Sequence, residues 1–204
     1  MSYTYRHLIK RFFLTVLFLI PSSIILGQSF LDDVKKYLQS QEGIHAEFHI
    51  TQILNDESSR QDGILELLDP EHFIYYTDEA IIRVNEESVF TYSPRHQHVI
   101  IDTYYPDEFN ALTILTGDFS KIEIGDVEEN FQTTSIHFIL SNTPYIGTIL
   151  FENSSFKPKS LKLDMDDIGS LDIIITAFEE INKSVLIEKY TIPQEGWEVL
   201  DLRE

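Results

Sequence analysis

Apolar and polar residues alternate along one segment after another of this chain. The clearest case runs from Leu161 to Asp166, where Leu, Leu and Met alternate with Lys, Asp and Asp. Because successive side chains of a strand point to opposite faces, this pattern predicts strands with one apolar and one polar face. We expect about nine or ten strands, in residues 46–50, 63–68, 73–76, 80–84, 88–92, 98–104, 135–140, 146–151, 160–165 and 171–178, with residues 55–62 as a polar turn.

Two segments have the spacing of amphipathic helices instead. In Ser29 to Gln39 the apolar residues fall on one helical face, Ser29 is a suitable N-cap and Gly43 follows the end. Pro106 to Gly117 predicts a second, short helix with a glycine C-cap. Strands and helices do not alternate, so the sheet is expected to be antiparallel. A sheet of this size curls, and the predicted fold is mainly β (α+β): one strongly curved antiparallel sheet that forms an unclosed barrel, covered by short lid helices.

The first 27 residues have the pattern of an export signal. Arg6, Lys10 and Arg11 precede an apolar run of about fifteen residues, which is short for a membrane span of about twenty. The predicted division is therefore a signal peptide in residues 1–27 and one domain in residues 28–204. The expected location is the periplasm, as a soluble exported protein; an uncleaved N-terminal anchor is the alternative. The chain has no cysteine for lipid attachment.

The charge balance argues against some partners. The chain has 34 Asp and Glu against 15 Lys and Arg, a net charge of −19. Such a field repels nucleic acid and anionic lipid headgroups. The absence of cysteine excludes structural disulfides and thiolate metal sites.

Motifs for chemistry are weak. Gly-x-Ser-x-Gly, His-Glu-x-x-His and a phosphate-binding glycine loop do not occur. His96 and His98 would share a strand face as metal ligands, but no third ligand has suitable spacing and a turn is the alternative. The run from Asp164 to Gly169 resembles the start of a calcium-binding loop. Ile168 and Ile175 stand at two positions of that loop that need oxygen ligands, so the run is better interpreted as an acidic hairpin turn. The sequence thus predicts no enzyme, no cofactor and no metal.

Aromatic and aliphatic residues remain as the functional surface. The chain has 14 Phe and 10 Tyr, many on predicted strands. Two short helices hold too little material to fill the hollow of a curled sheet, so the hollow is expected to accept an apolar ligand. The residues predicted to contact it are Phe48, Ile50, Leu65, Leu67, Phe73, Tyr75, Phe90, Tyr92, Leu112, Leu115, Phe138 and Leu140. Their inward direction is inferred from strand parity.

Six segments, in this order and spacing, resemble the periplasmic carrier proteins of the outer-membrane lipoprotein localisation pathway (the LolA family). They are HAEFHITQ (45–52), GILELLDPEHFIYY (63–76), VFTYSPRHQHVI (89–100), FNALTILTGD (109–118), LDMDDIGSLDIIIT (163–176) and PQEGWEVLD (193–201). Together they span nearly all of the chain after the export signal.

The resemblance implies an unclosed barrel with helices as a lid, which shuttles acylated lipoproteins toward the outer membrane. It also implies an inner-membrane release complex and an outer-membrane acceptor as partners, and a monomer. Phe73 matches a family phenylalanine at the cavity mouth. One departure concerns Asp69, where many members have an arginine that binds lid backbone; a carboxylate cannot donate those bonds. The alternatives are a related periplasmic binding protein for another lipid or glycolipid, and an exported lipid hydrolase.

Overall fold

A computed structural model describes residues 22–69, 71–105, 111–184 and 196–203, without the side chains of residues 22–28, 112 and 113. In chain order the elements are α2 (Ser22–Gln39), β1 (Ile44–Leu54), β2 (Glu57–Asp69), β3 (His72–Thr77), β4 (Ile81–Asn85), β5 (Ser88–Ser93), β6 (His98–Thr103), the 3₁₀ helix η1 (Ala111–Thr116), β7 (Ile122–Glu129), β8 (Thr133–Leu140), β9 (Ile146–Glu152), β10 (Pro158–Asp164), the 3₁₀ helix η2 (Asp166–Ile168), β11 (Gly169–Glu180) and β12 (Glu198–Asp201).

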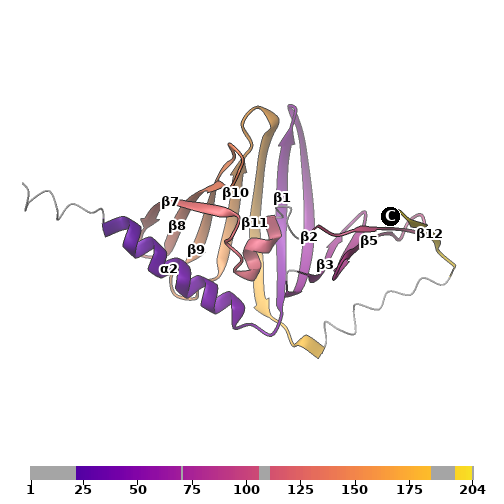
Figure 1. The fold of residues 1–204 in the computed structure, drawn as a ribbon, viewed down its shortest axis with the longest axis horizontal. Helices are drawn as coiled ribbons and strands as arrows, with labels where there is room; N and C mark the ends of the chain where they lie inside the picture. Colours follow the sequence, from indigo (N-terminus) through magenta and orange to yellow (C-terminus); the bar gives the residue numbers. More distant parts are fainter. Residues whose placement is uncertain (1–21, 70, 106–110, 185–195, 204) are drawn as a thin grey trace, which may run out of the picture.

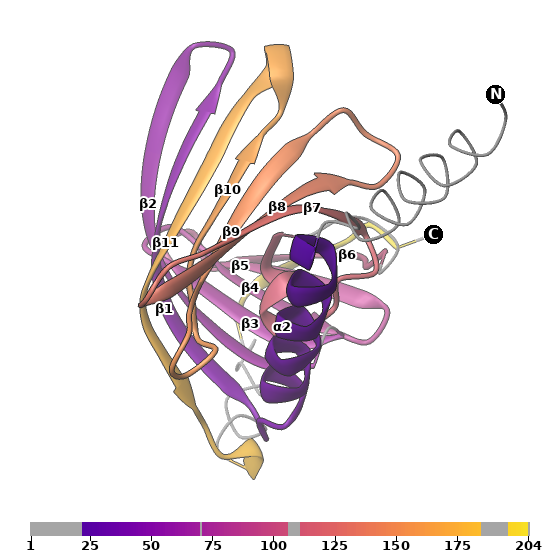
Figure 2. The same ribbon diagram turned by 90° about the vertical axis from the view of Figure 1, so that its left-hand side faces the viewer.

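The described strands form one twelve-stranded sheet in the order β12-β6-β5-β4-β3-β2-β1-β11-β10-β9-β8-β7. Neighbours are antiparallel except β12, which runs parallel to β6. The sheet curves around α2 but does not close, so β7 and β12 remain its two edges (Figures 1 and 2). The predicted fold class, an unclosed antiparallel sheet with a helical cover, is confirmed.

The main apolar cluster lies on the face that the sheet turns toward α2, here called the inner face. It collects side chains from β1–β4 and β7–β11 together with α2 and η1. Cross-strand partners share a face of a sheet, so the register carries the inner face from Leu67 to Phe73 and on to Val84 and Val89. All four belong to this cluster or pack against it.

A second apolar cluster lies on the opposite, outer face of β4–β6. It consists of Tyr92, Val99 and Ile101, with Ile81, Phe90 and Trp197 packed against it. Trp197 meets Tyr92 edge to face at a centroid distance of 5.9 Å. The guanidinium of Arg83 lies 4.1 Å from the centre of the Phe90 ring, close enough for a cation–π contact.

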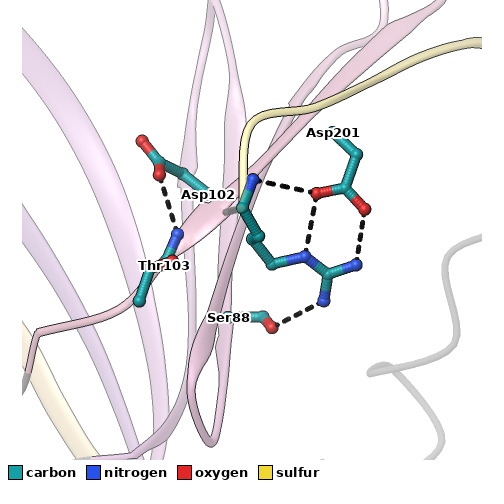
Figure 3. A network of polar contacts seen from close by, with 5 residues as sticks. Ser88, Asp102, Thr103 and Asp201 are labelled. Atoms are coloured by element: carbon teal, nitrogen blue, oxygen red, sulfur yellow. Dashed lines mark hydrogen bonds and ion pairs between the residues drawn. The ribbon is translucent and has the colours of Figure 1, made fainter.

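The C-terminal strand β12 is held beside this second cluster. Both carboxylate oxygens of Asp201 accept hydrogen bonds from the Arg203 guanidinium, at 2.9 and 2.6 Å. The same guanidinium donates to Ser88 Oγ at 3.1 Å (Figure 3). The hydrogen bonds from Arg203 hold the pKa of Asp201 down to about 2.

Several element predictions need correction. Residues 57–62, expected in a polar turn, belong to β2, and the turn is only Asn55-Asp56. Both residues have positive φ (50° and 68°), as a two-residue hairpin turn requires. The strand continues there because β1 pairs with it along its whole length. The β1–β2 hairpin thus reaches well above α2 (Figure 1).

The other differences lie at the ends of elements and at the sheet edges. Helix α2 ends at Gln39 as predicted but begins at Ser22, which places the expected cleavage site before Gln28 inside it. The edge strands β7 and β12 were not predicted. Of the expected helix 106–117, residues 106–110 lie outside the described part and residues 111–116 form the 3₁₀ helix η1.

Two glycines allow aromatic rings to lie flat on the inner face. A Cβ at Gly147 would collide with the ring of Phe138, its cross-strand partner, and would lie 2.8 Å from the carbonyl oxygen of Lys162. A Cβ at Gly63 would collide with the Tyr75 ring, which stacks on Phe48 at 5.6 Å. These rings fill the space that the missing side chains leave.

The Gly147–Phe138 contact predicts a stability difference between two strand glycines. Gly147→Ala should lower the free energy of unfolding by about 1–3 kcal/mol, because the ring must leave its position in a packed core. Gly125→Ala is the matched control: its Cβ would meet nothing closer than 3.4 Å, and the change should stay within about 0.5 kcal/mol. Urea unfolding of both variants measures the difference, and equal losses would contradict this packing.

Candidate functional site: the covered inner face and its rim

The inner face is covered by α2 and η1, together called the cover below (Figure 2). Val34 and Leu38 of α2 are fully buried in the main cluster. Phe30 of α2 packs against Phe151 and Phe156 at centroid distances of 6.2 and 5.6 Å. The helical spacing of these residues turns one face of α2 toward the sheet. The cover is therefore attached by apolar packing.

The second part of the cover, η1, buries Ile114 and Leu115 in the same cluster. Gly117 ends it with a φ of +78°, a left-handed conformation that suits glycine. An added Cβ there would lie 3.3 Å from the carbonyl oxygen of Lys35 and 3.4 Å from Leu38 Cβ. Gly117 thus lets η1 approach the backbone of α2 closely.

A cavity of about 320 Å³ opens at the rim, where the end of α2, the start of β1, the end of β2 and the segment after η1 meet. Its apolar wall includes Leu38, Ile44, Leu67 and Leu68, and its polar wall includes Lys35, Asp69 and Asp118 among others. An apolar floor beside a few polar groups is the usual composition of a ligand site. The cavity is therefore a candidate binding site at the edge of the cover.

Opposite charges lie near each other at this rim. Burial raises the pKa of Asp118, but the hydrogen bonds from Ser120 and the charges of Lys35 and Lys121 outweigh it, so the pKa lies below its ordinary value. Lys35 belongs to α2 and Asp118 follows η1. Their attraction joins the two parts of the cover, and it weakens with salt because the rim is partly exposed.

Asp69 orders its own turn. Its Oδ1 accepts hydrogen bonds from the Glu71 backbone at 2.9 Å and lies 2.8 Å from His72 Nδ1. The carboxylate also lines the rim cavity opposite Thr116, Gly117 and Asp118. Asp69 therefore adds negative charge to the rim.

The structure brings together most of the residues predicted to contact a ligand. Seven are buried in the main cluster: Phe48, Leu65, Leu67, Phe73, Leu115, Phe138 and Leu140. Ile50 and Tyr75 are partly buried against it. The side chain of Leu112 lies outside the described part.

Phe90 and Tyr92 were placed wrongly with that group. The register pairs Phe90 with Arg83 and Tyr92 with Ile81, on the outer face, where both aromatic residues join the second cluster. The residues of β5 that face inward are Val89 and Thr91. The prediction had assigned the larger side chains, Phe90 and Tyr92, to the inner face. Sequence reasoning also omitted Val34 and Leu38 from the site, although their helical spacing had marked an apolar face.

The expected hollow is filled in this structure. Among the described residues, the inner face is occupied by the protein's own aromatic and cover side chains, and a cavity lies beside it at the rim. The expectation of a hollow open to a ligand was wrong because side chains of the cover, among them Val34, Leu38 and Ile114, pack into the main cluster. Access to the inner face thus requires the cover to move.

A buried carboxylate lies on the outer face. Glu66 is 2% exposed, and its carboxylate accepts a hydrogen bond from the Tyr76 hydroxyl at 3.4 Å and lies 3.5 Å from His45 Nδ1. Burial, the charge of Glu66 and this hydrogen bond raise the pKa of Tyr76 to about 12. The group stabilises the sheet behind the inner face.

The candidate chemical motifs do not form a site in the described residues. His96 and His98 stack at 5.7 Å, with His96 in a turn where its Nδ1 lies 2.9 Å from Ser93 Oγ. The calcium-like run forms the turn between β10 and β11, as the hairpin interpretation predicted. Within the described ranges, no three His, Asp or Glu side chains are placed to hold a metal ion. No described helix is long and apolar enough to cross a membrane.

Comparison with known proteins gives a likeness of fold. No protein-family model and no curated protein matches the chain. An uncharacterised conserved protein from Thermus thermophilus is similar at a TM-score of 0.56 and 10% identity, over 86% of this chain and 98% of that one. This likeness shows that the two chains share a fold.

Two other solved structures are similar at lower scores. A LolA superfamily protein from Nitrosomonas europaea has a TM-score of 0.43 at 9% identity, over 80% of this chain and 98% of that one. A putative outer membrane lipoprotein-sorting protein domain from Vibrio parahaemolyticus has a TM-score of 0.44 at 9% identity, over 78% of this chain and 96% of that one.

The contact between the two parts of the cover can be tested at Gly117. Gly117→Ala should lower the free energy of unfolding by about 1–3 kcal/mol through its left-handed backbone and speed hydrogen exchange of α2 amides. Gly196→Ala is the matched control, because Gly196 also has a left-handed φ (+82°) but nothing within 4 Å of an added Cβ. Exchange of α2 that responds equally to both variants would contradict the contact.

The pKa of Tyr76 predicts an alkaline effect. Between its ordinary value of 10.0 and the folded value of about 12, the unfolded state loses a proton that the folded state keeps. The folded state then binds more protons, so the free energy of unfolding falls as pH rises through this window. Urea unfolding at several pH values should show a smaller alkaline loss for Tyr76→Phe than for the unchanged protein; identical slopes would rule out this assignment.

Proposed function

We propose that this protein is a periplasmic carrier that binds the acyl chains of lipoproteins, or of related lipids, on its inner face and moves them toward the outer membrane. One observation carries the proposal. The apolar face of an unclosed sheet is covered by one helix and one 3₁₀ helix, which pack on it through side chains and leave a cavity at their rim. The order of family-like segments in the sequence supports the same role.

Binding in this proposal is an exchange of covers. Burial of a chain of about sixteen carbons gains roughly 10 kcal/mol at about 0.8 kcal/mol per CH₂. Exposure of Val34, Leu38, Ile114 and Leu115, all buried here, costs about 6–12 kcal/mol in total at about 1.5–3 kcal/mol per side chain. Because these terms are similar in size, the carrier can both take up and release its cargo without an energy-consuming site of its own.

Asp69 favours one variation of this function. With Asp69 and Asp118 both lining the rim, the entrance carries carboxylates where many relatives place an arginine. A cargo whose polar part is neutral or basic fits such a rim better than an anionic one. A periplasmic binding protein for another lipid or glycolipid is therefore the second candidate.

The cargo can be identified directly. The protein without its first 27 residues, produced together with a triacylated lipoprotein, should yield a soluble one-to-one complex in native mass spectrometry. A mass increase of a glycolipid or isoprenoid instead would support the second candidate. A lipoprotein that stays entirely in the membrane fraction, with protein that carries no lipid, would rule out both.

Movement of the cover can be tested with an engineered disulfide. An added Cβ at Gly117 lies 3.4 Å from Leu38 Cβ, near the 3.5–4.5 Å range of disulfides, and the chain has no other cysteine. The Leu38→Cys/Gly117→Cys protein should lose cargo binding by about tenfold or more when oxidised and recover it when reduced. The reduced form is the matched control for both substitutions. Equal loading in both forms would show that cargo does not enter between α2 and η1.

A further inference from the structure

Phe131, in the turn between β7 and β8, is the most exposed large apolar side chain that the structure describes. Its exposed fraction is 97%, whereas the other exposed large apolar residues of the described ranges lie between 37% and 59%. Isolated exposed apolar residues are common on protein surfaces. An exposed phenyl ring is more informative when the backbone that carries it is fixed. The turn then holds the ring at one place on the surface, where a partner can bind it.

The Phe131 turn is fixed by its neighbours on both sides. Asn130 Oδ1 accepts hydrogen bonds from the backbone of Gln132 and Thr133, each at 2.9 Å. Asn130 Nδ2 donates to Thr133 Oγ1 at 2.8 Å. The side chain of Asn130 thus spans the turn and orders the backbone that carries the ring.

Asn153, from the turn after β9, anchors the same segment to the sheet. Its Nδ2 donates to the Asn130 carbonyl at 2.8 Å, and its backbone donates to the Gln132 carbonyl at 2.9 Å. Its Oδ1 accepts from Thr134, which is 1% exposed. The ring of Phe131 therefore extends from a turn that is ordered before any partner arrives, which reduces the entropy cost of association.

The charges beside the ring indicate what kind of surface it fits. Glu128 and Glu129 end β7 directly before the turn, and both are exposed. Glu128 lies 4.0 Å from His137, the histidine that faces it from β8. The chain as a whole is strongly acidic. Acidic groups around a central aromatic residue complement a pocket with a basic rim.

We propose that the β7–β8 turn docks onto a protein partner that offers an apolar pocket for Phe131, flanked by Lys or Arg side chains. An aromatic anchor at the centre of a small, pre-ordered contact is typical of interface hot spots. A bilayer fits less well, because a single ring buries little hydrocarbon and the carboxylates repel anionic headgroups.

The docking site lies beside the cover. The turn after β9 carries both Asn153, which anchors the Phe131 turn, and Phe156, on which Phe30 of α2 rests. A partner held at Phe131 would thus stand next to the helix that must move for cargo to pass. The proposal does not depend on acyl chains as cargo, since the loading experiment above can fail while the partner still binds.

The first stage of the test identifies the contact. A photoreactive p-benzoyl-phenylalanine in place of Phe131, in the full chain produced in its own host, should form an adduct with one envelope protein. The same group at Ile139, which is 46% exposed on the neighbouring strand β8, is the control for random collision. Adducts with lipid, or no more protein adduct at 131 than at 139, would overturn the proposal.

The second stage uses that purified envelope protein as the probe. Phe131→Ser should weaken its binding by about tenfold or more, whereas Ile139→Ser should change it by less than about twofold. Glu128→Lys/Glu129→Lys should also weaken binding and reduce its dependence on salt. Circular dichroism checks that each variant is folded. Affinity within about twofold of the unchanged protein for folded Phe131→Ser would overturn the proposal.

Discussion

Everything in this fold follows from a single sheet that does not close. A closed barrel satisfies its own edges and can surround its interior, whereas an open curved sheet leaves an apolar face that another element must cover. Here α2 and η1 supply that cover, and they are joined to the sheet by side-chain packing. Such packing is non-directional, so another apolar object of similar shape can replace it.

The sheet also changes which face is apolar along its length. From β7 to β3 most of the buried apolar side chains lie on the inner face, whereas in β4–β6 a separate cluster around Tyr92 lies on the outer face. Trp197, which precedes the edge strand β12, packs on that second cluster. One extended sheet thus has a helical cover on one side and, at its far edge, a strand whose end is joined to β5 by the hydrogen bond from Arg203 to Ser88.

Much of this arrangement could be predicted from local pattern. The alternation of apolar and polar residues located most strands, and helical spacing located the C-terminal part of α2. Both signals depend on residues that are close in sequence. The edge strand β7 was missed because its outward positions are largely acidic and its register is interrupted between Ile124 and Val127. The strand β12 was missed because its four residues, Glu198 to Asp201, do not alternate between apolar and polar. Its pairing with β6 is a contact between distant parts of the chain, which local pattern does not reveal.

The candidate site shows the same limit. Eight of the predicted ligand contacts share the inner face because their strands have a clear parity, as in Leu65 and Leu67. For Phe90 and Tyr92 both faces of the strand are apolar, so period two alone cannot decide between them. The filled interior could not be foreseen either, since the packing of α2 and η1 into the main cluster is a contact between distant parts of the chain.

A filled interior changes what a carrier of this design must do. A permanently vacant apolar hollow would hold its cargo with the full burial energy and would release it slowly. When the protein fills the hollow itself, the cover must first be displaced. The free energy of that displacement reduces the affinity for every cargo. Release then needs no separate energy source, because the returning cover replaces the departing chain on the same apolar face. In the proposed carrier, the close packing of Gly117 against α2 would therefore influence affinity together with the residues that line the inner face.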